Sequence, residues 1–127
     1  MLKDIKVYNN MGFYTNKKNR HFRRRSTTIK KENKVEKKNH PHYIVGENEH
    51  HYLSLGITHD RKKGKGHNNY PLVKNPNNYD KEQAYMKKQI ECAHKGAYSK
   101  YKLNYRLSDI DELFVDSLID KNTKYKK

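Results

Sequence analysis

The segment HPHYIVGENEHHYLSLGITH, residues 40–59, most strongly constrains how this chain can fold. Its two halves are rich in β-branched and aromatic residues, and the GENE stretch between them is typical of a turn. In the second half, Leu53, Leu55 and Ile57 fall on one side of an extended chain, with small or polar residues between them. The pattern predicts two antiparallel strands joined by a tight turn, with the second strand over about 51–58.

The second of these strands ends at Thr58 and His59, where the basic, glycine-containing loop DRKKGKGHNN begins. A hydroxyl and an imidazole at the end of a buried strand are typical of a scaffold that presents reactive groups on a loop. An ordinary strand that meets a solvated loop has the same pattern, so both interpretations stay open. The cations of the loop could contact RNA phosphates, and the candidate residues are Arg61, Lys62, Lys63, Lys65 and His67.

The N-terminal part of the chain carries most of the positive charge. Residues 1–40 hold 13 lysines and arginines against 3 acidic residues. Over 16–40 there is almost no apolar periodicity, which indicates a flexible segment, although 5–15 could form a short hairpin with its turn at 9–12. We therefore predict a basic N-terminal arm over 1–39. The run Arg23, Arg24 and Arg25 is its candidate contact to nucleic acid.

The C-terminal half changes from a two-residue to a helical period. QAYMKKQIEC, residues 83–92, alternates as a strand does, although Lys88 interrupts its apolar face. Ser108 followed by Asp111 resembles a capping box at a helix start. We predict a helix over 108–120 and a frayed tail over 121–127. The apolar stripe of this helix would be Ile110, Leu113, Phe114, Val115 and Leu118.

The order of these segments is strands, a basic loop, further strands and one closing helix. This order predicts a mainly β fold with a C-terminal helix, of the α+β class, in the form of a small, strongly bent antiparallel barrel over 40–120. Because only 32% of the residues are hydrophobic, the core must be small.

The formal net charge of +15 indicates a polyanionic partner, with RNA or another nucleic acid as the first candidate. No run of residues is apolar enough for a membrane span or a signal peptide, so we expect no membrane partner. The single cysteine, Cys92, fits a reducing, cytoplasmic setting. The 8 histidines lack a cysteine partner or a helical His-x-x-x-His spacing, so we expect neither a metal site nor another cofactor.

The pieces HPHYIV, LSLGITH and AYMKKQIECAHKGAYSKYKLNYRLSDID occur in an order that resembles the MazF/PemK family of toxin endoribonucleases. In that family a basic residue before a proline opens an aliphatic strand. A second apolar strand ends in threonine, and a long strand leads through a basic turn to the last helix. The resemblance covers about residues 40–120. The chain differs in having a basic arm in place of the family's first strand and glycine-rich loop.

The resemblance implies an SH3-like barrel and metal-independent cleavage of single-stranded RNA by attack of the 2′-hydroxyl on the adjacent phosphorus. His40 stands where the family has its catalytic arginine, and Thr58 stands at the strand-end threonine. The resemblance also implies a toxin–antitoxin setting, with a small acidic antitoxin protein as a partner, and a homodimer.

Such a reaction needs a proton acceptor, a proton donor and groups that stabilise the phosphoryl oxygens. Histidine suits the proton transfers, so His40 is one candidate and His59 or His42 is the second, while Thr58 could hydrogen-bond a non-bridging oxygen. Tyr85 and Lys87 are candidates for RNA binding, because an aromatic beside a cation suits single-stranded bases and phosphates.

Two other hypotheses stay open at this point. One is a non-catalytic basic module of a phage or mobile element that binds nucleic acid. The other is an inhibitor that binds an acidic protein surface.

Overall fold

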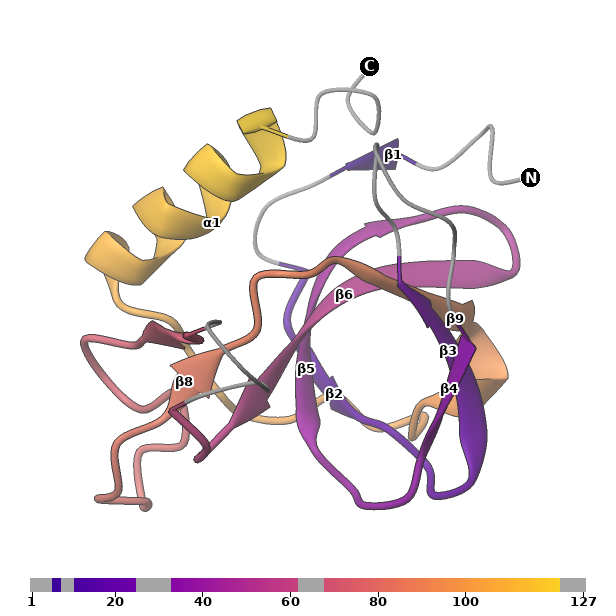
Figure 1. The fold of residues 1–127 in the computed structure, drawn as a ribbon, viewed down its shortest axis with the longest axis horizontal. Helices are drawn as coiled ribbons and strands as arrows, with labels where there is room; N and C mark the ends of the chain where they lie inside the picture. Colours follow the sequence, from indigo (N-terminus) through magenta and orange to yellow (C-terminus); the bar gives the residue numbers. More distant parts are fainter. Residues whose placement is uncertain (1–5, 8–10, 25–32, 62–67, 122–127) are drawn as a thin grey trace.

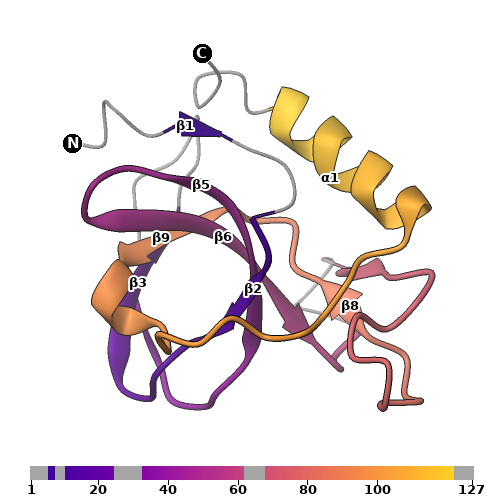
Figure 2. The ribbon, with the colours of Figure 1, turned by 180° about the vertical axis from the view of Figure 1, so that it is seen from behind.

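The computed structural model describes residues 6–7, 11–24, 33–61 and 68–121, and Figures 1 and 2 show its fold from opposite sides. A mainly antiparallel β-sheet and one C-terminal helix make up the fold, which confirms the predicted mainly β, α+β class. In chain order the elements are β1 (Lys6–Val7), β2 (Phe13–Thr15), β3 (Arg20–Arg24), β4 (Asn33–Glu36), β5 (Pro41–Glu47), β6 (His51–Thr58), β7 (Tyr70–Pro71), β8 (Tyr85–Met86), β9 (Glu91–His94), the 3₁₀ turn η1 (Lys95–Ala97) and α1 (Asp109–Lys121).

The predicted hairpin over 40–59 is the centre of the sheet. β5 and β6 pair antiparallel, with Tyr43 opposite Leu55. At the turn, the Asn48 backbone N–H donates to the His51 carbonyl over 3.0 Å. The Asn48 side-chain oxygen accepts from the backbone N–H groups of His50 and His51 over 3.0 and 2.8 Å. These bonds close the turn where the GENE stretch predicted it, and the predicted bounds of β6 are confirmed.

The segment 16–40 was predicted to be flexible, and this is wrong where the structure describes it, because β3 and β4 belong to the sheet. The sheet has the strand order β1-β5-β6-β9-β3-β4, and β2 also pairs with β5. β3 and β4 form a hairpin, and β3 pairs on its other side with β9. Phe22 in β3 is 0% exposed, so one large apolar side chain anchors a strand that is otherwise basic.

The predicted hairpin over 5–15 is also wrong. β1 and β2 both run antiparallel to β5, where Lys6 lies opposite Glu47 and Phe13 lies opposite Tyr43. β1 and β2 therefore run in the same direction, each pairs with β5, and they do not pair with each other. Gly12, just before β2, has a φ of +90°, a conformation that favours glycine.

Both faces of the β5–β6 hairpin are buried, and each face contributes to a different core. Leu53 and Leu55 pack with Val115 and Ile119 of α1 in the larger core. Ile44 belongs to the smaller core, with Phe22, Ala93, Ala97 and Tyr98. In Figures 1 and 2 the helix lies outside the curled sheet. The smaller core takes its residues from β3, β5, β9 and the segment from η1 to Tyr98, with side chains of β2 and β6 packed against it.

The sheet is strongly curled but not closed into a barrel. In the described part of the chain, the outer strands β1 and β4 do not pair with each other. The segment after η1 instead covers the free side of β2, where Ser99 N donates to Thr15 O over 2.7 Å and Leu103 N donates to Phe13 O over 2.8 Å. The SH3-like barrel therefore remains a prediction of the sequence.

The segment 83–92 forms two short strands, β8 and β9, in place of the single predicted strand. The four residues of its apolar face are all buried, namely Ala84, Met86, Ile90 and Cys92. The chain bends at residues 88 and 89, where Lys88 interrupts the apolar pattern. β8 pairs with the end of β6, opposite Ile57 and Thr58.

The predicted C-terminal helix is present as α1, and the Ser108 hydroxyl accepts from the Asp111 backbone N–H over 3.1 Å, as a helix cap does. The predicted apolar stripe is partly wrong, because Ile110 and Leu113 are 58% and 67% exposed. The buried face instead follows Asp111, Val115 and Ile119, with Phe114 and Leu118 partly buried beside it. In the described residues, no helix is long and apolar enough to cross a membrane.

The Asp111 carboxylate joins this helix to the segment after β7. It is 0% exposed and accepts hydrogen bonds from the Tyr70 hydroxyl over 2.9 Å and from the backbone N–H groups of Val73 and Lys74 over 3.0 and 3.3 Å. The Tyr70 ring also stacks on Phe114, with ring centroids 3.7 Å apart. Burial, and then the bond to Asp111, raises the pKa of Tyr70. Asp111 thus fixes the start of the loop that runs on to residue 82.

Candidate functional site

A cleft of about 420 Å³ lies where β5 begins and β6 ends. Three of the predicted catalytic residues, His40, Thr58 and His59, line it together. Its other wall comes from the loop 75–82 and includes Asp80. We call this the histidine cleft, defined by His40, Thr58, His59 and Asp80. The β5–β6 pairing explains the grouping, because the start of one antiparallel strand lies beside the end of its neighbour.

His40 reaches the cleft from a backbone that Asn16 holds in place. The Asn16 side-chain oxygen accepts from the His40 backbone N–H over 2.7 Å, and the Asn16 backbone N–H donates to the His40 carbonyl over 3.2 Å. The Asn16 amide also donates to the Lys38 carbonyl over 2.9 Å. Asn16 is 1% exposed. A single buried amide therefore fixes the segment that carries His40.

Thr58 lies at the rim of the core and is 7% exposed. Its Oγ1 accepts from the Asp60 backbone N–H over 3.1 Å. This bond uses a lone pair of the hydroxyl oxygen and leaves the O–H able to donate. Pairing with Tyr85 of β8 holds the Thr58 backbone from the other side. The hydroxyl is thus held at the lining of the same cleft as His40 and His59.

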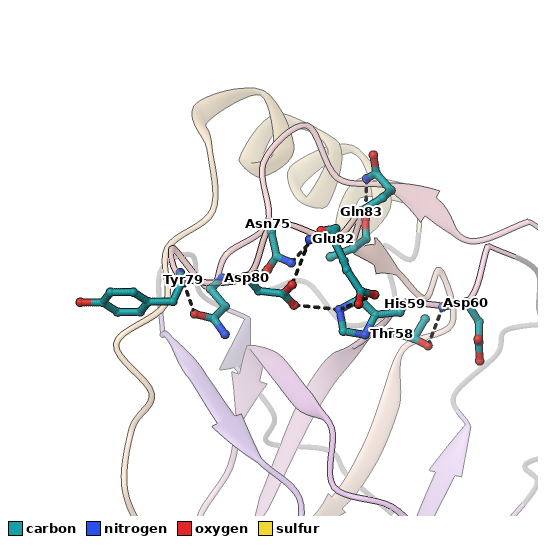
Figure 3. A network of polar contacts seen from close by, with 10 residues as sticks. Thr58, His59, Asp60, Asn75, Tyr79, Asp80, Glu82 and Gln83 are labelled. Carbon is teal, nitrogen blue, oxygen red and sulfur yellow. Dashed lines mark hydrogen bonds and ion pairs between the residues drawn. The ribbon is translucent and has the colours of Figure 1, made fainter.

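His59 and Asp80 form a hydrogen-bonded pair across the cleft. Nε2 of His59 lies 2.8 Å from Oδ2 of Asp80, and Figure 3 shows the carboxylate directed at the ring. The Asp80 side chain is 26% exposed and the His59 side chain 55%. The backbone N–H of Glu82, and then His59, lower the pKa of Asp80 below its ordinary value. The carboxylate is therefore ionised at neutral pH and can hold the imidazole in one orientation.

The loop that carries Asp80 is fixed by its own asparagine side chains. Oδ1 of Asn75 accepts from the Asn77 backbone N–H over 2.9 Å, and Nδ2 of Asn75 donates to the Glu82 carbonyl over 3.0 Å. Oδ1 of Asp80 accepts from the Glu82 backbone N–H over 3.0 Å. Asp80 was missed by sequence reasoning, which assigned no role to this loop. The dense run of Asn and Asp in KNPNNYDKE was the only signal available.

His42 was a candidate for proton transfer, but the structure places it in the smaller core and outside the histidine cleft. It is 0% exposed, and its ring stacks on Phe22 with centroids 5.1 Å apart. Nδ1 lies 3.2 Å from the Ser54 hydroxyl, and Nε2 lies 3.2 Å from the Asn16 side-chain oxygen. A substrate in the cleft cannot reach this ring, so the role of His42 is to join β5 and β6 to Asn16.

The predicted RNA-binding residues are dispersed. Arg61 is exposed just beyond the cleft, whereas Tyr85 and Lys87 are half-buried and lie outside its lining. Arg23 is exposed on β3, opposite Cys92 of β9, and it too lies outside the lining. Arg24 belongs to the same strand. The other candidates lie outside the described residues, namely Arg25, Lys62, Lys63, Lys65 and His67.

No group of three or more histidine, cysteine, aspartate or glutamate side chains in the described ranges is arranged to hold a metal ion. No family model matches the chain, and comparisons with curated proteins and with solved structures find no match either. The resemblance to the MazF/PemK family therefore stays a prediction from the sequence motifs.

Proposed function

We propose that this protein is a metal-independent endoribonuclease that cuts single-stranded RNA in the histidine cleft. The observation that supports this most is the His59–Asp80 hydrogen bond of 2.8 Å in the same cleft as His40 and Thr58. Two imidazoles and a hydroxyl beside one cavity provide the proton acceptor, the proton donor and the hydrogen bond that phosphodiester cleavage requires. The formal net charge of +15 favours a polyanionic substrate.

In the proposed reaction, the 2′-oxygen of one nucleotide attacks the adjacent phosphorus and forms a new O–P bond. The bond from phosphorus to the 5′-oxygen of the next nucleotide breaks. The 2′-hydroxyl proton passes to a base on the protein, and the leaving 5′-oxygen receives a proton from an acid. The products are a 2′,3′-cyclic phosphate and a 5′-hydroxyl.

His59 is the better candidate for the base. Because Nε2 lies 2.8 Å from the ionised Asp80, the neutral ring carries its proton on Nε2 and its lone pair on Nδ1. His40, in its protonated form, then supplies the proton to the leaving oxygen. The Thr58 O–H donates to a non-bridging oxygen, and the exposed Lys38 at the lining adds positive charge near the phosphate.

Incubation of the purified protein with single-stranded RNA in EDTA tests this proposal. We expect discrete fragments that carry 2′,3′-cyclic phosphate and 5′-hydroxyl ends, and no cleavage of DNA of the same sequence, which lacks the attacking 2′-hydroxyl. RNA that stays intact, or fragments with other end groups, would contradict the proposal.

A second candidate function is binding of nucleic acid without cleavage. The dispersed cations favour it, because Arg23 and Arg61 are exposed outside the lining of the histidine cleft. RNA that is bound with a steep dependence on salt, but not cut, would support this function in place of the first.

A further inference from the structure

Tyr79 is the most exposed large hydrophobic side chain of the described residues, at 92%. It lies in the loop 75–82, immediately before Asp80. Figure 3 shows that the two neighbours point in different directions, with Asp80 toward His59 and the Tyr79 ring away from the network. An aromatic ring that packs against nothing contributes little to folding, so its position calls for another explanation.

The backbone around Tyr79 is held on both sides. Its N–H donates to Oδ1 of Asn77 over 3.1 Å, and the N–H of Asp80 donates to the Asn77 carbonyl over 3.0 Å. The bond from Asn75 to Glu82 closes the base of the loop. The backbone that carries the ring is therefore held in place beside residues that line the cleft, and a ligand that binds the ring has little loop entropy to lose.

The loop separates two clefts. On one side is the histidine cleft, and on the other is a second cleft of about 370 Å³ that includes Lys74 and Lys81 in its lining. Asn77 and Asp80 contribute to the walls of both. A linear chain molecule that extends from the histidine cleft into the second cleft would cross this loop beside Tyr79.

We propose that Tyr79 is a base-stacking residue, which binds a nucleobase that flanks the scissile phosphate of single-stranded RNA. The inference rests on the proposed function for the identity of the substrate. Unpaired bases stack on tyrosine rings without sequence preference, and such stacking suits a ring that is open to solvent on a backbone held in place. A base within a duplex is already stacked on its neighbours, so the same ring favours single strands.

The test measures the Kd for a short single-stranded DNA oligonucleotide by fluorescence anisotropy, because DNA lacks the 2′-hydroxyl and stays uncut. We expect Tyr79→Ala to raise the Kd by about tenfold. Tyr79→Phe keeps the ring and should stay within about twofold of the wild type. The matched control is Tyr101→Ala, because Tyr101 is 72% exposed but belongs to the segment after η1 and not to the loop whose neighbouring residues line both clefts.

The outcomes distinguish the stacking role of Tyr79 from RNA cleavage in the histidine cleft. If the wild type binds the oligonucleotide and Tyr79→Ala binds equally well, or if Tyr101→Ala weakens binding as much, the role of Tyr79 is overturned while RNA cleavage is unaffected. If Tyr79→Ala weakens binding but the wild type leaves RNA intact, Tyr79 stacks on a base of a strand that is bound and not cut, and the nuclease proposal fails. A wild type that does not bind the oligonucleotide at all overturns the stacking role.

Discussion

Replacement of His59 by alanine is expected to lower the rate of RNA cleavage by about a hundredfold or more, because general acid–base catalysis contributes roughly that factor. The fold should be unaffected, since the His59 side chain is 55% exposed. We expect a similar loss for His40→Ala, which removes the proposed acid. The measurement is single-turnover cleavage of labelled RNA in EDTA, with the unfolding midpoint of each variant recorded alongside.

His50→Ala is the matched control for this experiment. His50 lies at the opposite end of β6, beside the turn, and its side chain is 65% exposed. Its removal should leave the cleavage rate within about twofold of the wild type, as expected for a surface histidine outside the site. Equal rates for His59→Ala and the wild type would exclude His59 as the base.

Replacement of Asp111 by alanine is expected to lower the free energy of unfolding by about 3 kcal/mol. The carboxylate is 0% exposed. Its loss leaves the Tyr70 hydroxyl and the backbone N–H groups of Val73 and Lys74 without their acceptor. Urea unfolding followed by circular dichroism measures the change.

The control for Asp111 is Asp109→Ala, which removes the same charge from the same helical turn. Asp109 is exposed, so its loss should cost at most about 1 kcal/mol through the helix dipole. If the two variants are equally stable, the bonds from Asp111 to the segment after β7 do not carry the stability that we assign to them.

The sequence predicts those parts of the fold that have a short-range pattern of apolar, turn or capping residues. The β5–β6 hairpin was predicted because its apolar residues alternate and its turn residues lie between them. The C-terminal helix was predicted over 108–120 from its cap and its period, and it is present at Asp109–Lys121. Its orientation was partly wrong, because the buried carboxylate of Asp111 replaces an apolar contact and leaves Ile110 and Leu113 in solvent.

β3 and β4 could not be predicted in the same way. Among the β3 side chains that the structure describes, Phe22 is the buried one, and the charged residues around it resemble a disordered arm in the sequence. The pairing of β3 with β9 joins segments almost 70 residues apart in the sequence. Pairing between such distant segments can form a strand where the local composition does not favour one, and no short-range sequence pattern predicts it.

The candidate site was predicted only in part. His40, Thr58 and His59 were found because they lie at strand ends, and the hairpin brings strand ends together. Asp80 and Asn16 were missed, because each acts through a contact with a distant residue. His42 was named as a candidate for the second proton transfer. Residues two positions apart share a face only along a regular strand. Here His40 precedes β5 and His42 lies within it.

The most direct test of the central claim is a titration of the protein with a single-stranded DNA oligonucleotide, followed through the ring C–H signals of its 8 histidines by nuclear magnetic resonance. We predict that the signals of His59 and His40 shift with the oligonucleotide concentration, while those of the buried His42 and the distant His50 stay in place. Shifts that are confined to other histidines, or no shift at all, would show that nucleic acid does not bind in the histidine cleft.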